Sequence, residues 1–118
     1  MVMETLQVLT ERIMAGARGW VEAVIIASPD GVPIAHNSKK ADIDVDKVAA
    51  VVAAIGGAAA ATVDLLGSDT YDRLDLRLGD GRYVLVRRHR KDYVICLTRP
   101  NPNLGLVNLV LDALLSKK

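Results

Sequence analysis

The chain has 118 residues, the size of one domain, and 51% of them are hydrophobic, so it can bury a core without disulfides or metals. Its 15 Lys and Arg residues nearly balance 14 Asp and Glu residues, which excludes a whole-molecule attraction to nucleic acid or acidic membranes. Cys96 is the only cysteine, so an intrachain disulfide is excluded and we expect a reducing, cytoplasmic location.

The N-terminal part predicts a helix followed by two strands. Residues 3–17 are amphipathic at helical spacing, with apolar and polar side chains on opposite faces. Residues 21–27 are apolar almost without interruption, which predicts a strand covered on both faces. Pro29 and Gly31 favour a tight turn, and residues 32–36 form the returning strand of a hairpin.

The C-terminal part predicts three more strands and a last helix. Residues 71–78 alternate, with Leu74, Leu76 and Leu78 on one side. Turns at 79–81 and 90–92 separate this strand from strands at 82–88 and 93–97, and the last of these is apolar throughout. Asn103 is suited to cap a helix at 104–115.

With a long helix at 45–66, the elements come in the order αββαβββα. Two strands buried on both faces require helices on both sides of one sheet, and the hairpin turns make the sheet mostly antiparallel. We therefore predict an α/β (α+β) fold, a three-layer α-β-α sandwich formed by residues 1–118 as one domain.

The long helix has two different apolar faces. Asp42-Ile43-Asp44 provides an Asx cap before it, and Gly67 ends it. One face is mostly branched, and we expect it on the sheet: Val48, Val51, Val52, Ile55, Ala59, Thr62, Val63 and Leu66. The other carries only small residues, with Gly56 near its edge: Ala49, Ala50, Ala53, Gly57, Ala60 and Ala61.

No charged residue lies between Lys47 and Asp64, whereas a solvated helix face would carry Lys, Glu or Gln. Small residues let two helix backbones approach closely, so we expect this face to contact another chain. The alternative is burial under another helix of the same domain, but both other helices are needed on the far side of the sheet. The apolar run at 48–63 is shorter than the roughly 20 residues that span a bilayer, so we expect no membrane insertion.

Several local strings resemble the roadblock / dynein light chain family. Residues 19–28 and 30–35, Gly-Trp-Val-Glu-Ala-Val-Ile-Ile-Ala-Ser and Asp-Gly-Val-Pro-Ile-Ala, are similar to the first hairpin of that family. The Ala-rich middle helix and the closing Pro-Asn-Leu-Gly-Leu at 102–106 are similar too. The resemblance covers residues 3–116 and rests on the order and spacing of these strings together.

The resemblance implies a five-stranded antiparallel sheet in the order 2-1-5-4-3. It also implies homodimers or heterodimers formed through the middle helix and the third strand, with the two sheets joined edge to edge. The dimer-interface residues that we expect are Ala50, Ala53, Gly57, Ala60, Ala61, Leu74 and Leu76. Family members are scaffolds and regulators of small Ras-like GTPases, or dynein light chains, and they share no catalytic residues.

The residues themselves show no catalytic, cofactor or metal constellation. Cys96 lies in an apolar strand, where a buried structural thiol is expected. His36 and His89 have no Cys or acid at metal-ligand spacing. Gly79-Asp80-Gly81 lacks the Lys and following helix of a phosphate loop and is expected to be a turn. We expect no enzymatic activity, no cofactor and no metal.

The one charge cluster is Arg87-Arg88-His89-Arg90-Lys91. It is either a solvated hairpin tip or a docking patch, with Arg87, Arg88, Arg90 and Lys91 as the docking residues. The function that we expect is a dimeric, non-enzymatic scaffold or regulator whose partner is a small Ras-like GTPase. The alternatives are a profilin-like sensor of a small ligand and, ranked third, a nucleic-acid binder that uses the basic tip.

Overall fold

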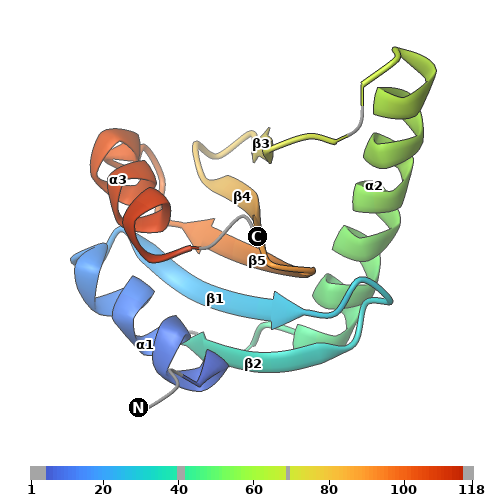
Figure 1. The fold of residues 1–118 in the computed structure, drawn as a ribbon. Coiled ribbons are helices and arrows are strands. Elements are labelled where there is room, and N and C mark those ends of the chain that lie inside the picture. Colours follow the sequence, from blue (N-terminus) through green and yellow to red (C-terminus); the bar gives the residue numbers. More distant parts are fainter. Residues whose placement is uncertain (1–4, 40–41, 69, 116–118) are drawn as a thin grey trace.

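The computed structural model describes residues 5–39, 42–68 and 70–115. Its elements follow the predicted order (Figure 1). They are α1 (Leu6–Gly16), β1 (Val21–Ala27), β2 (Pro33–Ser38), α2 (Val45–Leu65), β3 (Arg73–Arg77), β4 (Tyr83–His89), β5 (Asp92–Thr98) and α3 (Leu104–Leu114). The first helix begins later than predicted, after an N-cap at Thr5, and the predicted residues 3 and 4 lie outside the described part.

The sheet has the order β2-β1-β5-β4-β3, and all neighbouring strands are antiparallel. This confirms the predicted sheet. The two mostly apolar strands, β1 and β5, lie near its middle. Their side chains alternate between two cores, so that Val24 and Ile26 face one side while Ile25 and Ala27 face the other. The lack of polar alternation along these strands therefore follows from burial on both faces.

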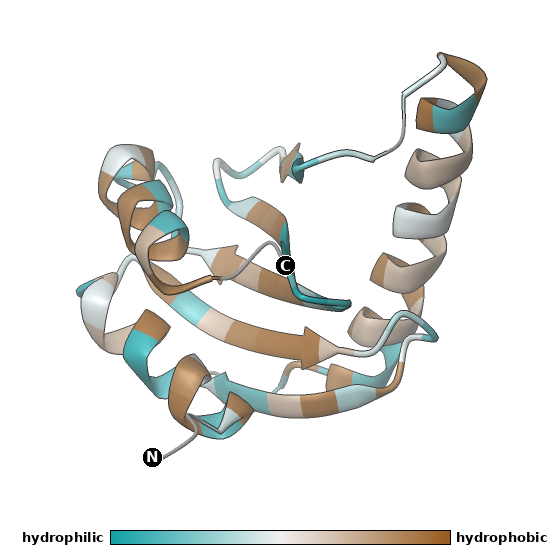
Figure 2. Cartoon of the chain, viewed as in Figure 1, coloured by the Kyte–Doolittle hydropathy of each residue, from teal (hydrophilic) through white to brown (hydrophobic). Residues whose placement is uncertain are grey.

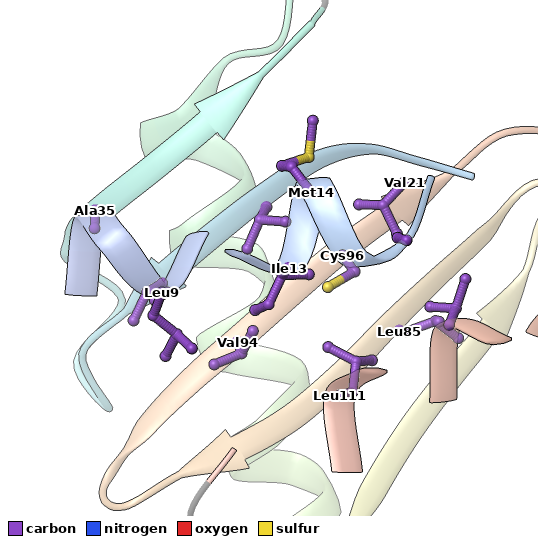
Figure 3. Close-up of a cluster of buried hydrophobic side chains, with 13 residues drawn as sticks. Leu9, Ile13, Met14, Val21, Ala35, Leu85, Val94, Cys96 and Leu111 are labelled. Carbon is purple, nitrogen blue, oxygen red and sulfur yellow. The ribbon is translucent and has the colours of Figure 1, made fainter. Parts of the chain in front are cut away.

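The helices form the two outer layers. α1 and α3 cover one face of the sheet, and Figure 3 shows their side chains around the strands in that larger core. α2 covers the other face, where Ala49 and Val52 pack with Ile25, Ile95 and Tyr93. This arrangement confirms the three-layer sandwich, and among the residues that the structure describes no other helix lies over the outer side of α2 (Figure 1).

Both predicted ends of α2 are confirmed. The Asp44 side chain accepts a hydrogen bond from the Lys47 N–H at 3.1 Å, which caps the first turn. At the other end, Gly67 has φ 78°, and the Ser68 N–H donates to the Val63 carbonyl at 3.0 Å. This closes the helix with a Schellman motif, which requires the left-handed conformation that glycine adopts without strain.

α2 is longer than the part of the sheet that it covers. Its 21 residues span about 31 Å at 1.5 Å per residue. The buried residues of the helix are Ala49, Val52 and Gly56, all in its first 12 positions. The second half extends away from the sheet (Figure 1), and none of residues 57–65 is fully buried in the described part of the protomer.

The predicted inward face of α2 is partly wrong. Ala49 and Gly56 face the sheet, whereas Val51 is 58% exposed and Leu66 is 79% exposed. Bulky groups from the sheet side already fill the space under the helix. The ring of Tyr93 reaches the helix at Gly56, and a Cβ on Gly31 in the β1–β2 turn would lie 3.1 Å from the Ala53 Cβ. At these two contact points only small helix residues fit, so Ala53 and Gly56 lie there, while Val52 still packs against the sheet and Val51 points outward.

Candidate protein–protein interface

The outer face of α2 is an exposed surface of small apolar residues. Ala50, Gly57, Ala60 and Ala61 are all exposed, and a Cβ added at Gly57 would meet nothing within 4 Å. The helix is drawn in apolar shades over most of its length (Figure 2). A flat surface without long side chains allows another backbone to approach closely, and it costs almost no side-chain entropy to order.

The distal end of α2 carries the most exposed large hydrophobic side chains among the described residues. Leu65 is 87% exposed and Leu66 is 79% exposed. Two adjacent exposed leucines at a helix end are unusual for a surface that remains in water, because burying one leucine stabilises a protein by about 1.5–3 kcal/mol. This end therefore favours contact with another apolar surface.

The strand β3 forms one edge of the sheet and pairs only with β4. Leu74 is partly buried against the α2 core, and Leu76 is 40% exposed. At the opposite edge, the Gln7 side chain of α1 donates to the His36 carbonyl of β2 at 3.0 Å. The β2 edge thus has cover from α1, and β3 is the edge better placed for pairing with another strand.

The seven predicted interface residues lie on α2 and β3, which are consecutive elements of the chain. Five of them are exposed: Ala50, Gly57, Ala60, Ala61 and Leu76. Ala53 and Leu74 are partly buried against the core beneath α2, so they stand at the inner border of the surface. Their role in an interface remains a prediction.

An apolar cavity of about 90 Å³ lies between the start of α2 and the sheet. It has no polar surface. Its lining comes from the segment before α2, the first turn of α2, and strands β1, β4 and β5: Ala23, Ile25, Ile43, Val48, Val84, Ile95 and Leu97. This hollow was not foreseen from the sequence, because its walls come from five separate segments.

A polar network missed by the sequence analysis fixes the connection from α2 to β3. The Tyr71 hydroxyl donates to the Gly56 carbonyl at 3.2 Å. The Arg88 guanidinium lies 5.1 Å from the ring centre of Tyr93 and 5.9 Å from that of Tyr71, which are cation–π contacts. Burial, reinforced by the neighbouring Tyr93 hydroxyl, raises the pKa of Tyr71. The adjacent Gly-Gly pair was the one available signal for this close approach.

The structure divides the basic cluster, and it excludes Arg87 from an exposed docking patch. Arg87 is 5% exposed. Its Nη1 lies 2.5 Å from the Asp75 carboxylate on β3, and its Nη2 donates to the Asn108 side chain of α3 at 2.8 Å. Successive strand residues point to opposite faces, so Arg87 turns toward α3 while Arg88 turns toward α2.

Arg90 and Lys91 are exposed in the β4–β5 turn, as a docking or solvated tip requires. Beside them lies a cavity of about 210 Å³ between the β3 approach, the end of β4 and the end of α3, lined by Thr70, Tyr71, Asp72, Arg87, Arg88, Arg90, Leu111, Asp112 and Leu115. Its cations and carboxylates are mixed, so it has no strong preference for an anion.

Cys96 is fully buried among the side chains of the core that α1 and α3 cover (Figure 3). Desolvation raises the pKa of its thiol to about 12, so the nucleophilic thiolate does not form near neutral pH. Residues 79–81 form the predicted turn, with the Leu78 N–H donating to the Arg82 carbonyl at 2.7 Å. Within residues 5–39, 42–68 and 70–115, no group of three metal-ligating side chains is present.

By length and composition alone, α2 could cross a membrane, since its most apolar 18-residue window has a mean hydropathy of 1.9. The same helix contains Asp46, Lys47 and Asp64 and packs on its own sheet through Ala49 and Val52. The expectation that it does not insert into a membrane remains a prediction.

Comparison with solved structures identifies the fold. Myxococcus xanthus MglB superposes with a TM-score of 0.83 and 16% identity, covering 92% of this chain and 86% of that protein. A Roadblock/LC7 domain from Streptomyces avermitilis gives 0.81 at 13% identity, covering 94% and 92%. A structure of MglB with a tetrameric arrangement gives 0.78 at 17% identity, covering 89% and 78%. No curated protein matches the sequence.

Profilins share this fold at a greater distance. Acanthamoeba castellanii profilin II superposes with a TM-score of 0.63 and 16% identity, covering 94% of both chains. The family model of the Roadblock/LC7 domain matches residues 14–98 of the sequence, which is most of the chain and all of the sheet. The chain belongs to the Roadblock/LC7 domain family.

Proposed function

We propose that this protein is a dimeric, non-enzymatic scaffold or regulator that binds a small Ras-like GTPase in the cytoplasm. The Roadblock/LC7 family consists of small-GTPase-associated scaffolds and regulators. The observation that carries the proposal is the uncharged, exposed outer face of α2, together with the open β3 edge of the sheet. A protein with this surface is suited to assembly with other proteins.

The same face supports a dimer of identical chains. α2 exposes apolar groups on one face of the sheet and β3 exposes unpaired backbone groups at one edge of it, and a two-fold axis would pair each with its own copy. Pairing of two β3 strands would join the sheets, and the small residues of α2 would let the two helices lie close together. Each copy then covers what the other leaves exposed.

Light scattering tests the dimer. Wild-type protein at tens of micromolar is expected to have twice the monomer mass, and Gly57→Glu or Ala60→Glu is expected to give folded monomers, because each puts a carboxylate into the contact. Leu109→Glu is a matched control, since Leu109 is 66% exposed on α3, on the other face of the sheet. A wild-type monomer at this concentration would disprove the dimer.

Binding to the GTPase can change its nucleotide state without any catalytic group on this chain. A partner that binds one conformation of the switch loops more tightly shifts the loops toward that conformation. The test is affinity capture from the native cell lysate with the GTPases loaded with GDP or with a non-hydrolysable GTP analogue. If no GTPase of that cell binds in either state, the regulator proposal fails.

The cavities favour a scaffold over the sensor alternative. Pockets that bind drug-sized ligands measure roughly 300–1,000 Å³, whereas the two cavities described above measure about 90 and 210 Å³. Neither of these two cavities, within the described residues, is large enough for a ligand of that size. Nucleic-acid binding has less support from the structure than from the sequence, because the burial of Arg87 removes one cation from the predicted basic patch.

A further inference from the structure

The strand β3 forms an open edge of the sheet beyond β4 (Figure 1). The Leu78 N–H donates to the Arg82 carbonyl across the β3–β4 turn. Hydrogen-bonded and non-hydrogen-bonded residue pairs alternate along an antiparallel ladder. The backbone groups of residues 73, 75 and 77 are therefore directed away from β4, toward the open edge, where another strand can bond to them.

The side chains of this edge alternate in charge on the face of the sheet where α3 lies. Arg73 lies 3.9 Å from the Asp112 carboxylate of α3, and Asp75 accepts a hydrogen bond from the buried Arg87. Arg77 points to the same face, because strand side chains repeat with a period of two. It is exposed and forms no ion pair with any residue that the structure describes. The edge thus presents a positive, a negative and an unpaired positive group in turn.

The opposite face of the same strand is apolar. Leu74 packs against the core beneath α2, so Leu76 and Leu78 point to that side as well. Leu76 is 40% exposed in the protomer. A strand that binds at this edge must therefore match charges on one face and leucines on the other.

A second copy of β3 can pair with this edge in three symmetric registers that keep most of the strand paired. In an antiparallel pair related by a two-fold axis, one residue of each strand lies opposite its own copy. This central residue is 74, 75 or 76. Centring on Asp75 would place Asp75 opposite itself and Arg73 opposite Arg77, and like charges that lie directly opposite one another are destabilising.

The other two registers both place Asp75 opposite an arginine. Centring on Leu74 pairs Asp75 with Arg73, which already has an acidic partner on α3, and places a leucine opposite an aspartate. Centring on Leu76 pairs Asp75 with the unpaired Arg77 and places Leu76 opposite its own copy. The Asp75 side chain is 36% exposed, so its carboxylate remains open to a second arginine. Only the register centred on Leu76 matches both faces.

We propose that two copies pair their β3 strands in the register centred on Leu76, so that Asp75 of each copy forms an ion pair with Arg77 of the other. The inference rests on the proposed dimer and names the residues that determine its register. The two ion pairs lie on the α3 side of the joined sheet, and the two copies of Leu76 meet on the α2 side. This order of charges makes the edge selective for a second copy of the same chain, because a strand with another order of charges would lose both ion pairs.

The first test measures the register by oxidation of single-cysteine variants and separation on a non-reducing gel. In the proposed register the two copies of residue 76 form a non-hydrogen-bonded pair, with Cα atoms about 4.5 Å apart, a distance that a disulfide can bridge. Leu76→Cys is therefore expected to give a covalent dimer. Leu74→Cys is the matched control, because its two copies would lie about 14 Å apart along the strands. The native Cys96 is fully buried and is the same in both variants.

The second test measures the dimer dissociation constant by sedimentation equilibrium. Arg77→Glu is expected to raise it at least about tenfold, since two ion pairs become two contacts between like charges. Arg73→Glu makes the same charge change on the same face of β3 but lies opposite Gly79 of the second copy, so it should alter the constant by about twofold or less. Both arginines are exposed, so both variants should retain the circular dichroism spectrum of the wild type.

The outcomes separate the registers from one another and from the proposed dimer. Weakening by Arg77→Glu alone, together with the Leu76→Cys link, would establish the register centred on Leu76. A wild-type dimer that is weakened by Arg73→Glu instead, that links through Leu74→Cys, or that responds to none of these changes would overturn this register and leave the dimer intact. A monomeric wild type would overturn both.

Discussion

The hydroxyl of Tyr93 occupies the space into which a side chain at Gly56 would extend. A Cβ on Gly56 would lie 2.6 Å from the Tyr93 Oη and 2.7 Å from its Cζ, distances at which one group must move. The glycine of α2 that faces the sheet is thus required by a tyrosine of β5, and the next glycine, Gly57, has open space. Two adjacent identical residues therefore have different reasons to be glycine.

Gly56→Ala is expected to destabilise the protein, although alanine is favoured over glycine in a helix by about 1 kcal/mol. Overpacking against Tyr93 costs roughly 1–3 kcal/mol and should exceed that gain. Gly57→Ala, one position away, is expected to cost nothing in the protomer. Urea unfolding of both variants at one protein concentration measures the difference, and equal stability would show that α2 does not sit on Tyr93 as described.

Arg87→Met is expected to lower the free energy of unfolding by about 2 kcal/mol, because Asp75 and Asn108 both lose a charged hydrogen-bond donor. The side chain of Arg87 is 6% exposed and that of Asp75 is 36% exposed, so water relieves only part of the loss. Lys91→Met, in the adjacent exposed turn, serves as the control and should stay within about 0.5 kcal/mol of wild type. Chemical denaturation that ranks the two variants equally would contradict the structural role of Arg87.

Charge reversal at Arg90 and Lys91 is expected to slow association with the GTPase partner more than it speeds dissociation. Exposed charges at the rim of an interface act mainly through steering, and salt should produce the same effect. Surface plasmon resonance at low and high ionic strength measures both rates. Lys39→Glu, an exposed residue just after β2, is the control for net charge. Unchanged rates at low salt would identify the tip as a solvated turn.

Cys96 is expected to resist thiol reagents in the native protein at pH 8 and to react fully in denaturant. The pKa of its thiol is about 12 when folded and near 9 in the unfolded chain. Unfolding therefore releases a proton above pH 9, so the stability contributed by the neutral buried thiol is complete below pH 9 and falls as pH rises toward 12.

Cys96→Val, which keeps the site apolar, isolates this effect from the other groups that titrate at high pH. The stability of wild type relative to the variant should decrease across pH 9–12 in urea titrations. A difference that stays constant across this range, or rapid labelling of the native thiol, would contradict the burial of Cys96.

Vesicle flotation tests whether α2 enters a bilayer. The purified protein is expected to stay with the soluble fraction in the presence of neutral or anionic vesicles, because half of α2 is packed on the sheet and its ends carry Asp46, Lys47 and Asp64. Co-flotation that survives high salt, together with protection of α2 from added protease, would instead place the helix in the membrane.

The order of apolar and polar residues along the chain, together with its capping and turn residues, predicted most of the architecture. The almost continuous apolar runs of β1 and β5 indicated burial on both faces, which required helices on both sides of the sheet. The caps of α2, the hairpin turns and the position of the last helix also follow from local chemistry, because Asp44, Gly67 and Asn103 act on backbone groups only a few positions away. Local rules of this kind need no knowledge of the rest of the fold.

The tertiary structure decided which side of α2 faces inward and where each arginine of the basic cluster lies. A helical wheel ranks faces by hydrophobicity, but the space under α2 was set by Tyr93 and by the turn at Gly31, so Ala49 and Gly56 turned inward and Val51 outward. Arg87 lies between β3 and α3 because its guanidinium donates hydrogen bonds to Asp75 of β3 and to Asn108 of α3. Both results depend on side chains far apart in the chain, whose volume and charge compete for the same space only after the chain has folded.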